Sequence, residues 1–162
     1  MRSWNMRVRE VAYLYNPVFC GRILYSTIKA YGEKINEPFP FPLVYLVLPL
    51  ILHAETRNSI NSIQKIQKWI KEYPQVLIEY PQRARSLVPF TNEAVEFLLQ
   101  TKLLQLTSNG ELQISEDLKP LSENKFSDKE ISDCLKKAKQ IGRWFATAGK
   151  VETIYVRLGV RP

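Results

Sequence analysis

The residues that could carry out catalysis are few, and their spacing forms no catalytic group. His53 is the only histidine, so a Ser-His-Asp or Cys-His arrangement would have to use it. It lies at the end of the most apolar segment with no nucleophile motif nearby, which favours a hydrogen-bonded histidine at a helix end. The two cysteines, Cys20 and Cys134, are far apart in the sequence and make no disulfide framework. With one histidine they cannot form a Cys/His zinc site unless carboxylates or a second chain contribute.

One further pattern resembles an active-site motif only in part. Gly149-Lys150 looks like the end of a phosphate-binding loop, but Trp144 stands where the first glycine belongs and Val151 where Ser or Thr would hold magnesium. The carboxylates are scattered, and nothing fixes the spacing of a pair as a glycosidase requires. The sequence therefore predicts no catalytic residue, no cofactor, no metal site and no small-molecule substrate.

The composition is that of an ordinary globular chain. Its 162 residues are 45% apolar and 24% charged, and a chain of this length buries about two-thirds of its unfolded surface as one domain, or one domain with arms. The longest apolar stretch, residues 39–52, contains three prolines and is shorter than the roughly twenty residues of a membrane helix. Charged residues follow the initial methionine where a secretory signal would be apolar, so we expect a cytoplasmic protein with reduced thiols and no membrane contact.

The net charge of +7 is concentrated at the two ends of the chain. Residues 1–30 hold five cations against one carboxylate, and residues 125–162 hold nine against four, whereas residues 31–124 hold nine against eleven. If the ends converge on one face, that face would suit an acidic protein or a phosphate backbone. A solvated face that keeps the protein soluble is the other interpretation.

Three helices are expected before residue 74. Asn16-Pro17 is typical of a cap and first residue, and Gly32 can end the helix that follows. Residues 43–53 are apolar nearly all round, as in a buried helix, with a kink at Pro49. Isoleucines recur at three- and four-residue intervals from residue 60, which predicts an amphipathic helix that ends before Pro74.

Residues 87–114 have the outline of a winged helix. Thr91 can cap a helix that has Glu93 in its first turn, and from residue 104 the apolar period changes from 3.6 to 2. Asn109-Gly110 suits a type I′ turn between two strands. With the helices before it, the order is helix, helix, helix, hairpin.

The remainder is expected to be helical. Ser127 and Glu130 form a capping box at the start of a long helix that Gly149 ends. Residues 151–158 fit a short helix closed by Gly159, although a strand of period 2 fits almost as well. We therefore expect a mainly α fold with a small β-hairpin, in which a winged-helix-like unit has N-terminal helices and a long C-terminal helix.

As a single domain, the chain divides into four segments. Residues 1–42 form an N-terminal helical arm and a Pro-rich lead, and residues 43–115 the winged-helix-like core. Residues 116–124 form an acidic loop, and residues 125–162 the basic C-terminal helices.

The winged-helix unit favours protein docking over reading of DNA. Its last helix would enter the major groove, yet its polar side chains include two carboxylates and only one cation. Duplex phosphates would repel that face, and the hairpin tip is acidic as well.

Several arginines and one tryptophan are candidates for a protein interface. Arg83 and Arg85 are expected to point the same way on a short helix, or opposite ways in an extended chain; Arg83 could also make a salt bridge to Glu79 or Glu93. Arg and Trp dominate interface hot spots, although core packing is the favoured explanation for Trp144. The candidate interface residues are Arg83, Arg85, Arg143, Trp144, Arg157 and Arg161.

Five blocks, taken together and in order from about residue 7 to the C-terminus, resemble a known family. They are NPVFC at 16–20, YLVLPLILH at 45–53 followed by Thr56-Arg57, RARSLVPF at 83–90 followed by Thr91 and Glu93-Ala94, IGRWFATAG at 141–149, and the ending from Ile154-Tyr155 to LGVRP at 158–162. The chain resembles the middle component of three-component ABC systems, which are prokaryotic conflict systems that include Lamassu-type defence. No block is diagnostic alone, but all five occur in register.

The resemblance implies a small non-enzymatic subunit beside a large, dimeric SMC-like or Rad50-like ABC ATPase and a separate effector, commonly a nuclease. Sensing of phage or plasmid DNA would belong to the ATPase and killing to the effector, with the middle subunit joining them. The resemblance supplies no catalytic residues. A stand-alone winged-helix regulator that binds DNA is the alternative.

Overall fold

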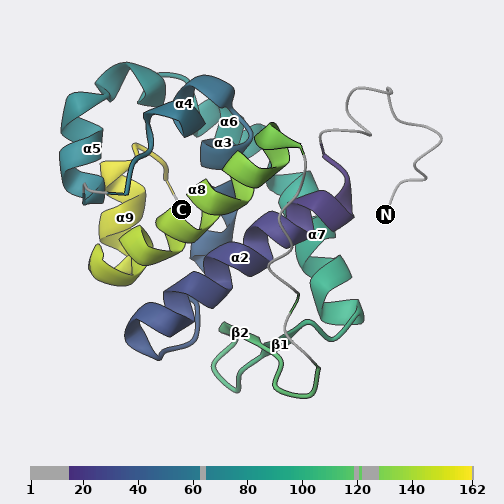
Figure 1. The fold of residues 1–162 in the computed structure, drawn as a ribbon. Coiled ribbons are helices and arrows are strands. Elements are labelled where there is room, and N and C mark those ends of the chain that lie inside the picture. Colours follow the sequence, from purple (N-terminus) through teal and green to yellow (C-terminus); the bar gives the residue numbers. More distant parts are fainter. Residues whose placement is uncertain (1–14, 63–64, 119–120, 122–127, 162) are drawn as a thin grey trace.

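Helices make up most of the computed structural model, which describes residues 15–62, 65–118, 121 and 128–161. One antiparallel hairpin of two short strands accompanies them, and a long helix lies in the C-terminal part (Figure 1). This mainly α class with a small hairpin is the one that the sequence predicts. The elements are α2 (Pro17–Ile35), the 3-10 helix η2 (Phe41–Leu46), α3 (Val47–Ile51), α4 (Ala54–Ser59), α5 (Ile66–Glu72), the 3-10 helix η3 (Pro74–Leu77), α6 (Tyr80–Ser86), α7 (Val88–Gln100), β1 (Leu104–Leu106), β2 (Leu112–Ile114), α8 (Lys129–Thr147) and α9 (Val151–Arg157).

Helix α2 starts where the sequence predicts but ends later. The side chain of Asn16 accepts the backbone N–H of Val18 at 2.8 Å, and Pro17 occupies the first turn, where its missing N–H is not needed. Gly32 does not end the helix, as we had expected; it lies inside α2. The left-handed conformation that closes the helix is at Asn36 (φ 54°), whose N–H reaches the carbonyl of Gly32 at 2.8 Å.

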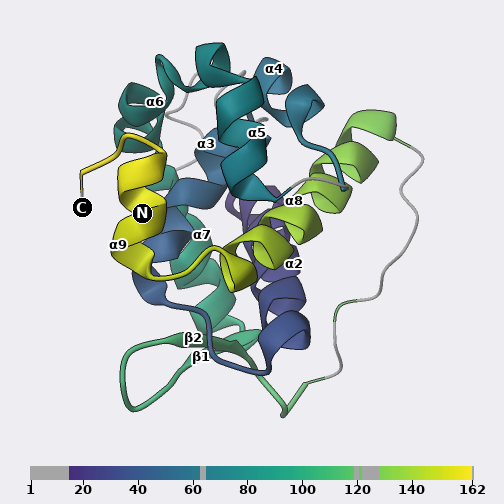
Figure 2. The same ribbon diagram turned by 90° about the vertical axis from the view of Figure 1, so that its left-hand side faces the viewer.

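Helices α2 and α8 form the central pair of the fold. They pack against each other, and α2 also packs against α7 and β2 (Figures 1 and 2). Thr27 Oγ1 donates to the carbonyl of Ala138 across this pair at 3.0 Å. Gly142 lies where the backbones are closest: a Cβ there would collide with the Thr27 carbonyl oxygen and lie 3.0 Å from Tyr31 N. Helix α2 is therefore central and is not an arm, in contrast to the expected segment 1–42.

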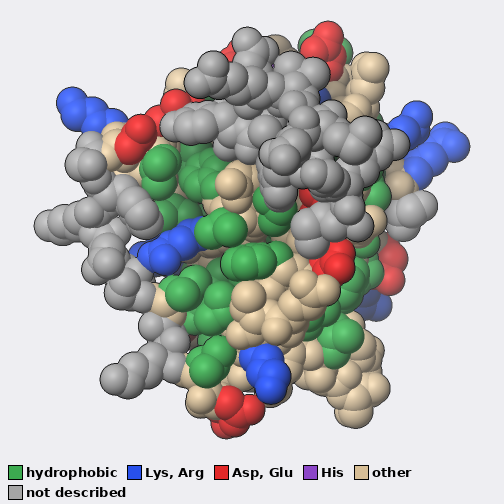
Figure 3. Space-filling view, turned by 90° about the vertical axis from the view of Figure 1, so that its right-hand side faces the viewer, with side chains coloured by type: hydrophobic (Ala, Val, Ile, Leu, Met, Phe, Trp, Pro, Cys, Tyr) green, Lys and Arg blue, Asp and Glu red, His purple; other side chains and the backbone are tan. Residues whose placement is uncertain are grey.

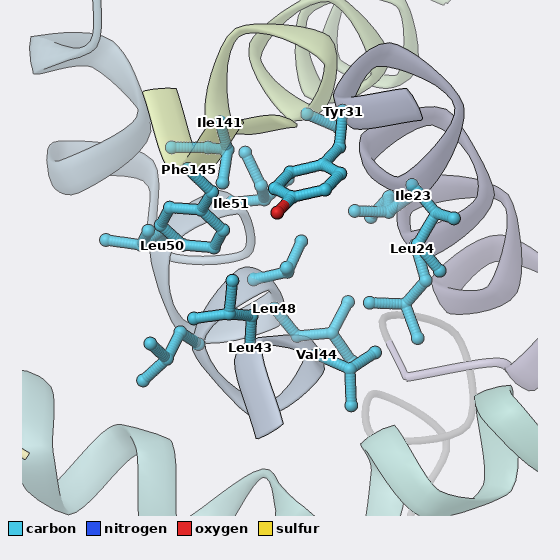
Figure 4. Packing of buried hydrophobic residues seen from close by; sticks show 14 of the residues in the cluster. Ile23, Leu24, Tyr31, Leu43, Val44, Leu48, Leu50, Ile51, Ile141 and Phe145 are labelled. Atoms are coloured by element: carbon cyan, nitrogen blue, oxygen red, sulfur yellow. The ribbon is translucent and has the colours of Figure 1, made fainter. Parts of the chain in front are cut away.

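The apolar segment after residue 40 is two short helices and not one kinked helix. The 3-10 helix η2 passes into α3 at Val47, so Pro49 falls in the first turn of α3 and its missing N–H breaks no helical hydrogen bond. Every residue of α3 is buried. Figure 4 shows Leu48, Leu50 and Ile51 of α3 facing the same interior space as side chains of α2 and α8.

The predicted helix from residue 60 begins later than its isoleucine pattern suggests. Ile60 is extended (φ −75°, ψ 128°) and closes α4, and α5 begins at Ile66 and ends before Pro74 as predicted. Ile60 is 1% exposed and its carbonyl accepts a hydrogen bond from Lys137 of α8. The extended backbone at Ile60 makes this bond to α8 possible, and the tertiary contact overrides the local helical period.

Helix α7 also starts earlier than the sequence indicates. It begins at Val88 with Pro89 in its first turn, so Thr91 is a helical residue and not the cap, and Glu93 is beyond the first turn. Thr91 is 0% exposed, and its hydroxyl has no hydrogen-bond partner. The structure therefore explains Thr91 by the packing of its buried methyl group, and not by capping of the helix.

The hairpin is present, but its turn differs from the predicted type I′. Leu106 pairs with Leu112, and Thr107 N donates to the Glu111 carbonyl, which leaves a loop of three residues. Gly110 N donates to the Thr107 carbonyl at 3.0 Å and Gly110 has φ 76°, the pattern of a type I turn with a G1 bulge. Only Gly110 needs the left-handed conformation, so Asn109 keeps a negative φ.

A third short segment joins the hairpin. Phe39 and Leu112 exchange two backbone hydrogen bonds of 2.7 and 2.8 Å. The elements around the hairpin follow the order α2, bridge strand, α3 to α6, α7, β1 and β2. This order is compatible with the winged-helix-like unit that the sequence predicts, and α2 packs against α7 and β2 of it.

The C-terminal helices largely follow the sequence. Asp128 caps α8, because its carboxylate accepts the N–H groups of Glu130 at 2.8 Å and Ile131 at 3.1 Å. The predicted cap Ser127 lies outside the described residues, as does most of the acidic loop 116–124. Gly149 (φ 94°) follows the end of α8, and residues 151–157 are helical, which confirms the helix over the strand.

Candidate docking site

His53 serves as a helix cap. Its Nδ1 lies 2.8 Å from Thr56 Oγ1 and 3.4 Å from Thr56 N, whose N–H it accepts, so the ring caps the start of α4. His53 is thus a hydrogen-bonded histidine at a helix end, although the sequence did not predict the helix that it caps. Burial lowers the pKa of His53, and the nearby Arg83 charge lowers it further. The imidazole is therefore held neutral as an acceptor.

Neither cysteine forms a disulfide within the part of the chain that the structure describes, and both are buried. Burial raises the pKa of Cys20 to about 12 and that of Cys134 to about 11, so both thiols stay protonated at neutral pH and neither is activated as a nucleophile. Within the residues that the structure describes, no group of three His, Cys, Asp or Glu side chains could hold a metal ion. No helix in that part of the chain is both long and apolar enough to cross a membrane.

Arg83 and Arg85 point away from each other, which corrects the expectation that a short helix would align them. Residues two apart on an α-helix are separated by about 200°. Arg83 donates to Thr56 Oγ1 and to the Val76 carbonyl, both at 3.1 Å, and lies over the Tyr80 ring. Its Nε is buried without a hydrogen-bond partner, and burial lowers its pKa. Arg83 therefore ties α6 to α4 and η3, in place of the salt bridges considered from the sequence.

Arg85 and Arg161 line one pocket, which we call the α6–α9 pocket. It has a volume of about 440 Å³ and lies between η2, α6, the start of α7, and α9 with the residues that follow it. Both arginines are exposed although they line it, so they stand at its rim. The sequence separates them by 76 positions, and only the fold brings them together.

The wall of the α6–α9 pocket is chiefly apolar. The rings of Tyr45 and Tyr155 line it, together with Pro81 and Val88. The Tyr45 hydroxyl donates to Asn92 Oδ1 at 2.7 Å, and the Tyr155 hydroxyl donates to the Pro42 carbonyl. Since both hydroxyls are engaged within the protein, the guanidinium groups are the main polar side-chain groups free to meet a ligand there.

The residues after α9 are held in place by a helix-ending motif. Val160 N donates to the Tyr155 carbonyl and Gly159 N to the Val156 carbonyl, both at 3.0 Å, with Gly159 at φ 74°. A Cβ at Gly159 would lie 3.8 Å from Pro81, so the turn lies directly on α6. This turn is what places Arg161 at the pocket.

Trp144 and Arg143 are neighbours with opposite environments. Trp144 is 3% exposed and its ring lies 5.3 Å from that of Trp69, centroid to centroid, so it belongs to the core and not to the rim. Arg143 is exposed on α8. Core packing, the explanation favoured for Trp144 from the sequence, is confirmed, and we do not retain Trp144 as an interface residue.

A row of cations follows the outer face of α8, and we call it the α8 basic stripe. It consists of Lys129, Lys136 and Arg143, which are all exposed and seven residues apart. Two helical turns separate successive members, or about 10 Å along the axis. Only Arg143 was singled out from the sequence, although the seven-residue spacing could have identified the others. Arg157, on α9, is exposed as well.

Arg57 is the charged residue whose importance the sequence analysis missed. Its side chain is 7% exposed, and its guanidinium reaches Glu130 and Asp133 of α8, both at 3.2 Å, and the Ile51 carbonyl at 2.8 Å. It therefore fixes α4 and α3 to the first turns of α8. Its two partners on α8 are more than 70 positions away, so no local pattern could have indicated this role.

The exposed face of α7 does not suit the major groove. Asn92, Glu96 and Gln100 lie one turn apart on it, and the Gln100 amide donates to the Glu96 carboxylate at 3.0 Å. The hairpin tip adds no cation, since Ser108, Asn109 and Gly110 are uncharged. The structure therefore retains the lack of positive charge on the α7 face and the hairpin tip, which is the feature of the sequence that favoured protein docking over DNA reading.

A small helical protein with a winged-helix-like unit, a basic-rimmed apolar pocket and a basic helix face has surfaces suited to docking. The chain belongs to the family described as ABC-three component (ABC-3C) system Middle Component 3, whose pattern matches residues 4–162. It is therefore a middle component of a multi-part ABC-3C system, as the resemblance of the five blocks implies. No curated protein matches the chain, and no solved structure does.

Proposed function

We propose that this protein is a non-catalytic adaptor that joins two other components of its ABC-3C system. The observation that carries the proposal is the presence of two different docking surfaces on one small chain. The α6–α9 pocket is apolar with a basic rim, and the α8 basic stripe is polar and convex. Figure 2 shows α6 and α9 at one edge of the molecule and α8 running toward the opposite edge, so two partners can be held at once.

The partners in this proposal are an SMC-like ABC ATPase, acting as a dimer, and a separate effector, which by the family resemblance is a nuclease. The complex would work in the cytoplasm against phage or plasmid DNA, as in Lamassu-type defence. The adaptor would hold the effector inactive until the ATPase senses foreign DNA. Family membership supports an accessory role in a multi-part system, and the protonated thiols and the capping role of His53 are consistent with a subunit that performs no chemistry.

The test is co-expression with the products of the neighbouring genes, followed by size-exclusion chromatography with light scattering. We expect this chain to elute in a complex that contains an ATPase and an effector. Elution of the chain as a free monomer in the presence of both products would overturn the proposal. Turnover of a substrate by the purified chain alone would contradict the non-catalytic role.

A second candidate function is direct contact with the backbone of duplex DNA through the α8 basic stripe. Three exposed cations in a row could neutralise several phosphates, and such binding would be non-specific and sensitive to salt. The exposed face of α7 does not favour the alternative function, a stand-alone regulator that reads a DNA sequence, because the Glu96 carboxylate on this face would repel the DNA phosphates.

Fluorescence anisotropy of a labelled duplex in a salt series tests this second function. Contact by all three cations predicts a slope of log K against log salt of about −2.7, and the pair Lys136→Glu with Arg143→Glu should reduce its magnitude by about two. The pair Arg85→Glu with Arg161→Glu changes the net charge equally and serves as the control. Equal weakening by both pairs would show that net charge alone, and not the stripe, attracts the DNA.

A further inference from the structure

We propose that the α6–α9 pocket binds a segment of a partner protein in which an aromatic or branched aliphatic side chain stands next to one or two carboxylates. This inference rests on the proposed adaptor function and specifies the chemistry of one of its partners. It is carried by the pocket's size, by its apolar wall and by the charge of its rim.

The pocket has room for a large apolar anchor. Its volume of about 440 Å³ lies within the range of well-formed ligand sites. The Tyr45 and Tyr155 rings face it with their hydroxyls already bonded elsewhere, so these rings offer apolar and π surface. Burial of one aromatic or leucine side chain against such a wall favours binding.

The charge of the rim selects an acidic neighbour for that anchor. Arg85 and Arg161 line the pocket, and the described residues that line it include no carboxylate. Guanidinium groups bind carboxylates through two parallel hydrogen bonds, which gives the rim a geometric preference for such groups. A basic segment would be repelled by the same two charges.

The polar groups of the wall favour a protein segment over a nucleotide or a sugar. Such ligands need several placed donors and acceptors to recognise a base or hydroxyl groups. Apart from the two arginines and the engaged tyrosines, the described side chains of the wall are apolar, such as Pro81, Ala84 and Val88. The wall therefore provides apolar contact and a cationic rim, which an acidic segment with an apolar anchor would satisfy.

The pocket wall is fixed before a partner arrives. The turn at Gly159 packs on Pro81 of α6, and its two hydrogen bonds hold the backbone that leads to Arg161. Ala84 and Tyr155 are buried, so the helices on either side are anchored in the core. A preformed wall lowers the entropic cost of binding.

Other surface features carry no comparable inference. The pocket that Arg83 lines, of about 460 Å³, contains the carboxylate Glu79 and borders Tyr15, next to residues that are not described. Figure 3 shows hydrophobic side chains gathered on one face of the molecule. Neither feature shows what would cover it.

The experiment measures binding of the purified chain to each purified partner by biolayer interferometry. Two pocket variants are compared with wild type: Arg85→Glu with Arg161→Glu, which reverses the rim, and Val88→Trp, which fills the pocket without changing charge. The matched control is Lys136→Glu with Arg143→Glu, which makes the same change in net charge on α8. Circular dichroism and the melting temperature check that each variant is folded.

We expect both pocket variants to weaken binding to one partner by about tenfold or more, while the α8 control leaves that partner's binding unchanged. Overlapping peptides from that partner should then include one acidic segment with an aromatic or aliphatic residue that binds wild type and not the variants. Unchanged binding by folded pocket variants would overturn the inference and leave the adaptor function standing. Equal loss in the control would also overturn it, because general electrostatics would explain the result. Failure of wild type to bind any partner would instead overturn the adaptor function.

Discussion

Substitution of Gly142 by alanine tests the closest contact in the fold. Gly142 lies in α8 against the backbone of α2, and an added Cβ would collide with the Thr27 carbonyl oxygen and lie 3.0 Å from Tyr31 N. Both neighbours are backbone atoms of a helix and cannot rotate away as a side chain could. The two helices would have to separate, which would also stretch the 3.0 Å hydrogen bond from Thr27 to Ala138.

The expected cost follows from two opposing effects. Overpacking of a core costs about 3 kcal/mol when the surroundings are as rigid as here. Alanine is favoured over glycine inside a helix by about 1 kcal/mol, which offsets part of that cost. Gly142→Ala should therefore lower the free energy of unfolding by about 2 kcal/mol, which in a chain of this size lowers the melting temperature by about 4 to 8 °C.

Two other glycines provide matched controls for the same substitution. Gly32 lies in the last turn of α2, where a Cβ would be 3.8 Å from the nearest atom, so Gly32→Ala should raise stability by about 0.5 to 1 kcal/mol. Gly21 is intermediate, because a Cβ would meet the Phe97 and Leu98 side chains at 3.2 and 3.4 Å. These side chains can shift, and Gly21→Ala should have an effect between the other two.

Urea unfolding followed by circular dichroism gives the three free energies under one set of conditions. The order of stability should be Gly32→Ala, Gly21→Ala, Gly142→Ala. A Gly142→Ala variant as stable as wild type would refute the reasoning, because it would mean that α2 and α8 are not in backbone contact at this point. A loss at Gly32 as large as that at Gly142 would equally contradict it.

Three further changes probe single side chains. Thr91→Val should leave the free energy of unfolding unchanged or raise it by up to about 1 kcal/mol in thermal unfolding, because the buried hydroxyl has no hydrogen-bond partner. A decrease of that size would instead indicate that the Thr91 hydroxyl caps the helix. Arg57→Met should lower the free energy of unfolding by about 2 kcal/mol, because the Ile51 carbonyl loses a charged hydrogen-bond donor. An unchanged midpoint of urea unfolding would show that the contacts of Arg57 do not stabilise the fold. Because the folded-state pKa of His53 is lowered, its contribution to stability is present above the ordinary value of 6.5 and is lost as the pH falls through the lowered pKa. His53→Asn keeps a capping acceptor and should flatten this part of the melting temperature against pH profile; an unchanged profile would assign the slope to another group.

Signals that act over a few residues were accurate guides to this fold. Asn16-Pro17 does begin α2, Pro74 does follow the end of α5, and residues 151–157 do form a helix closed at Gly159. Each depends on one backbone hydrogen bond or one restricted dihedral angle, so the sequence around it is sufficient. The same holds for the mainly α class and the hairpin.

The boundaries that were wrong lie where a distant contact competes with the local pattern. Ile60 leaves its isoleucine period because its carbonyl bonds to Lys137 of α8, and Thr91 is buried inside α7 although it resembles a cap. For Trp144 the sequence favoured the core but left an interface position open, and its packing on Trp69 decides for the core. The sequence of one helix does not show which of its side chains are buried when the helix that covers them lies far away in the sequence.

The sequence by itself determined the helical class, the hairpin, the scarcity of catalytic groups and the kinship with ABC-3C middle components, because all of these depend on composition, short-range spacing or matched blocks. Only the tertiary structure decided the candidate docking site. Tyr45, Arg85, Tyr155 and Arg161 come from four separate parts of the chain and meet at one pocket. They meet because α9 and the turn at Gly159 pack on α6, and packing between elements is a property of the whole fold that no local pattern encodes.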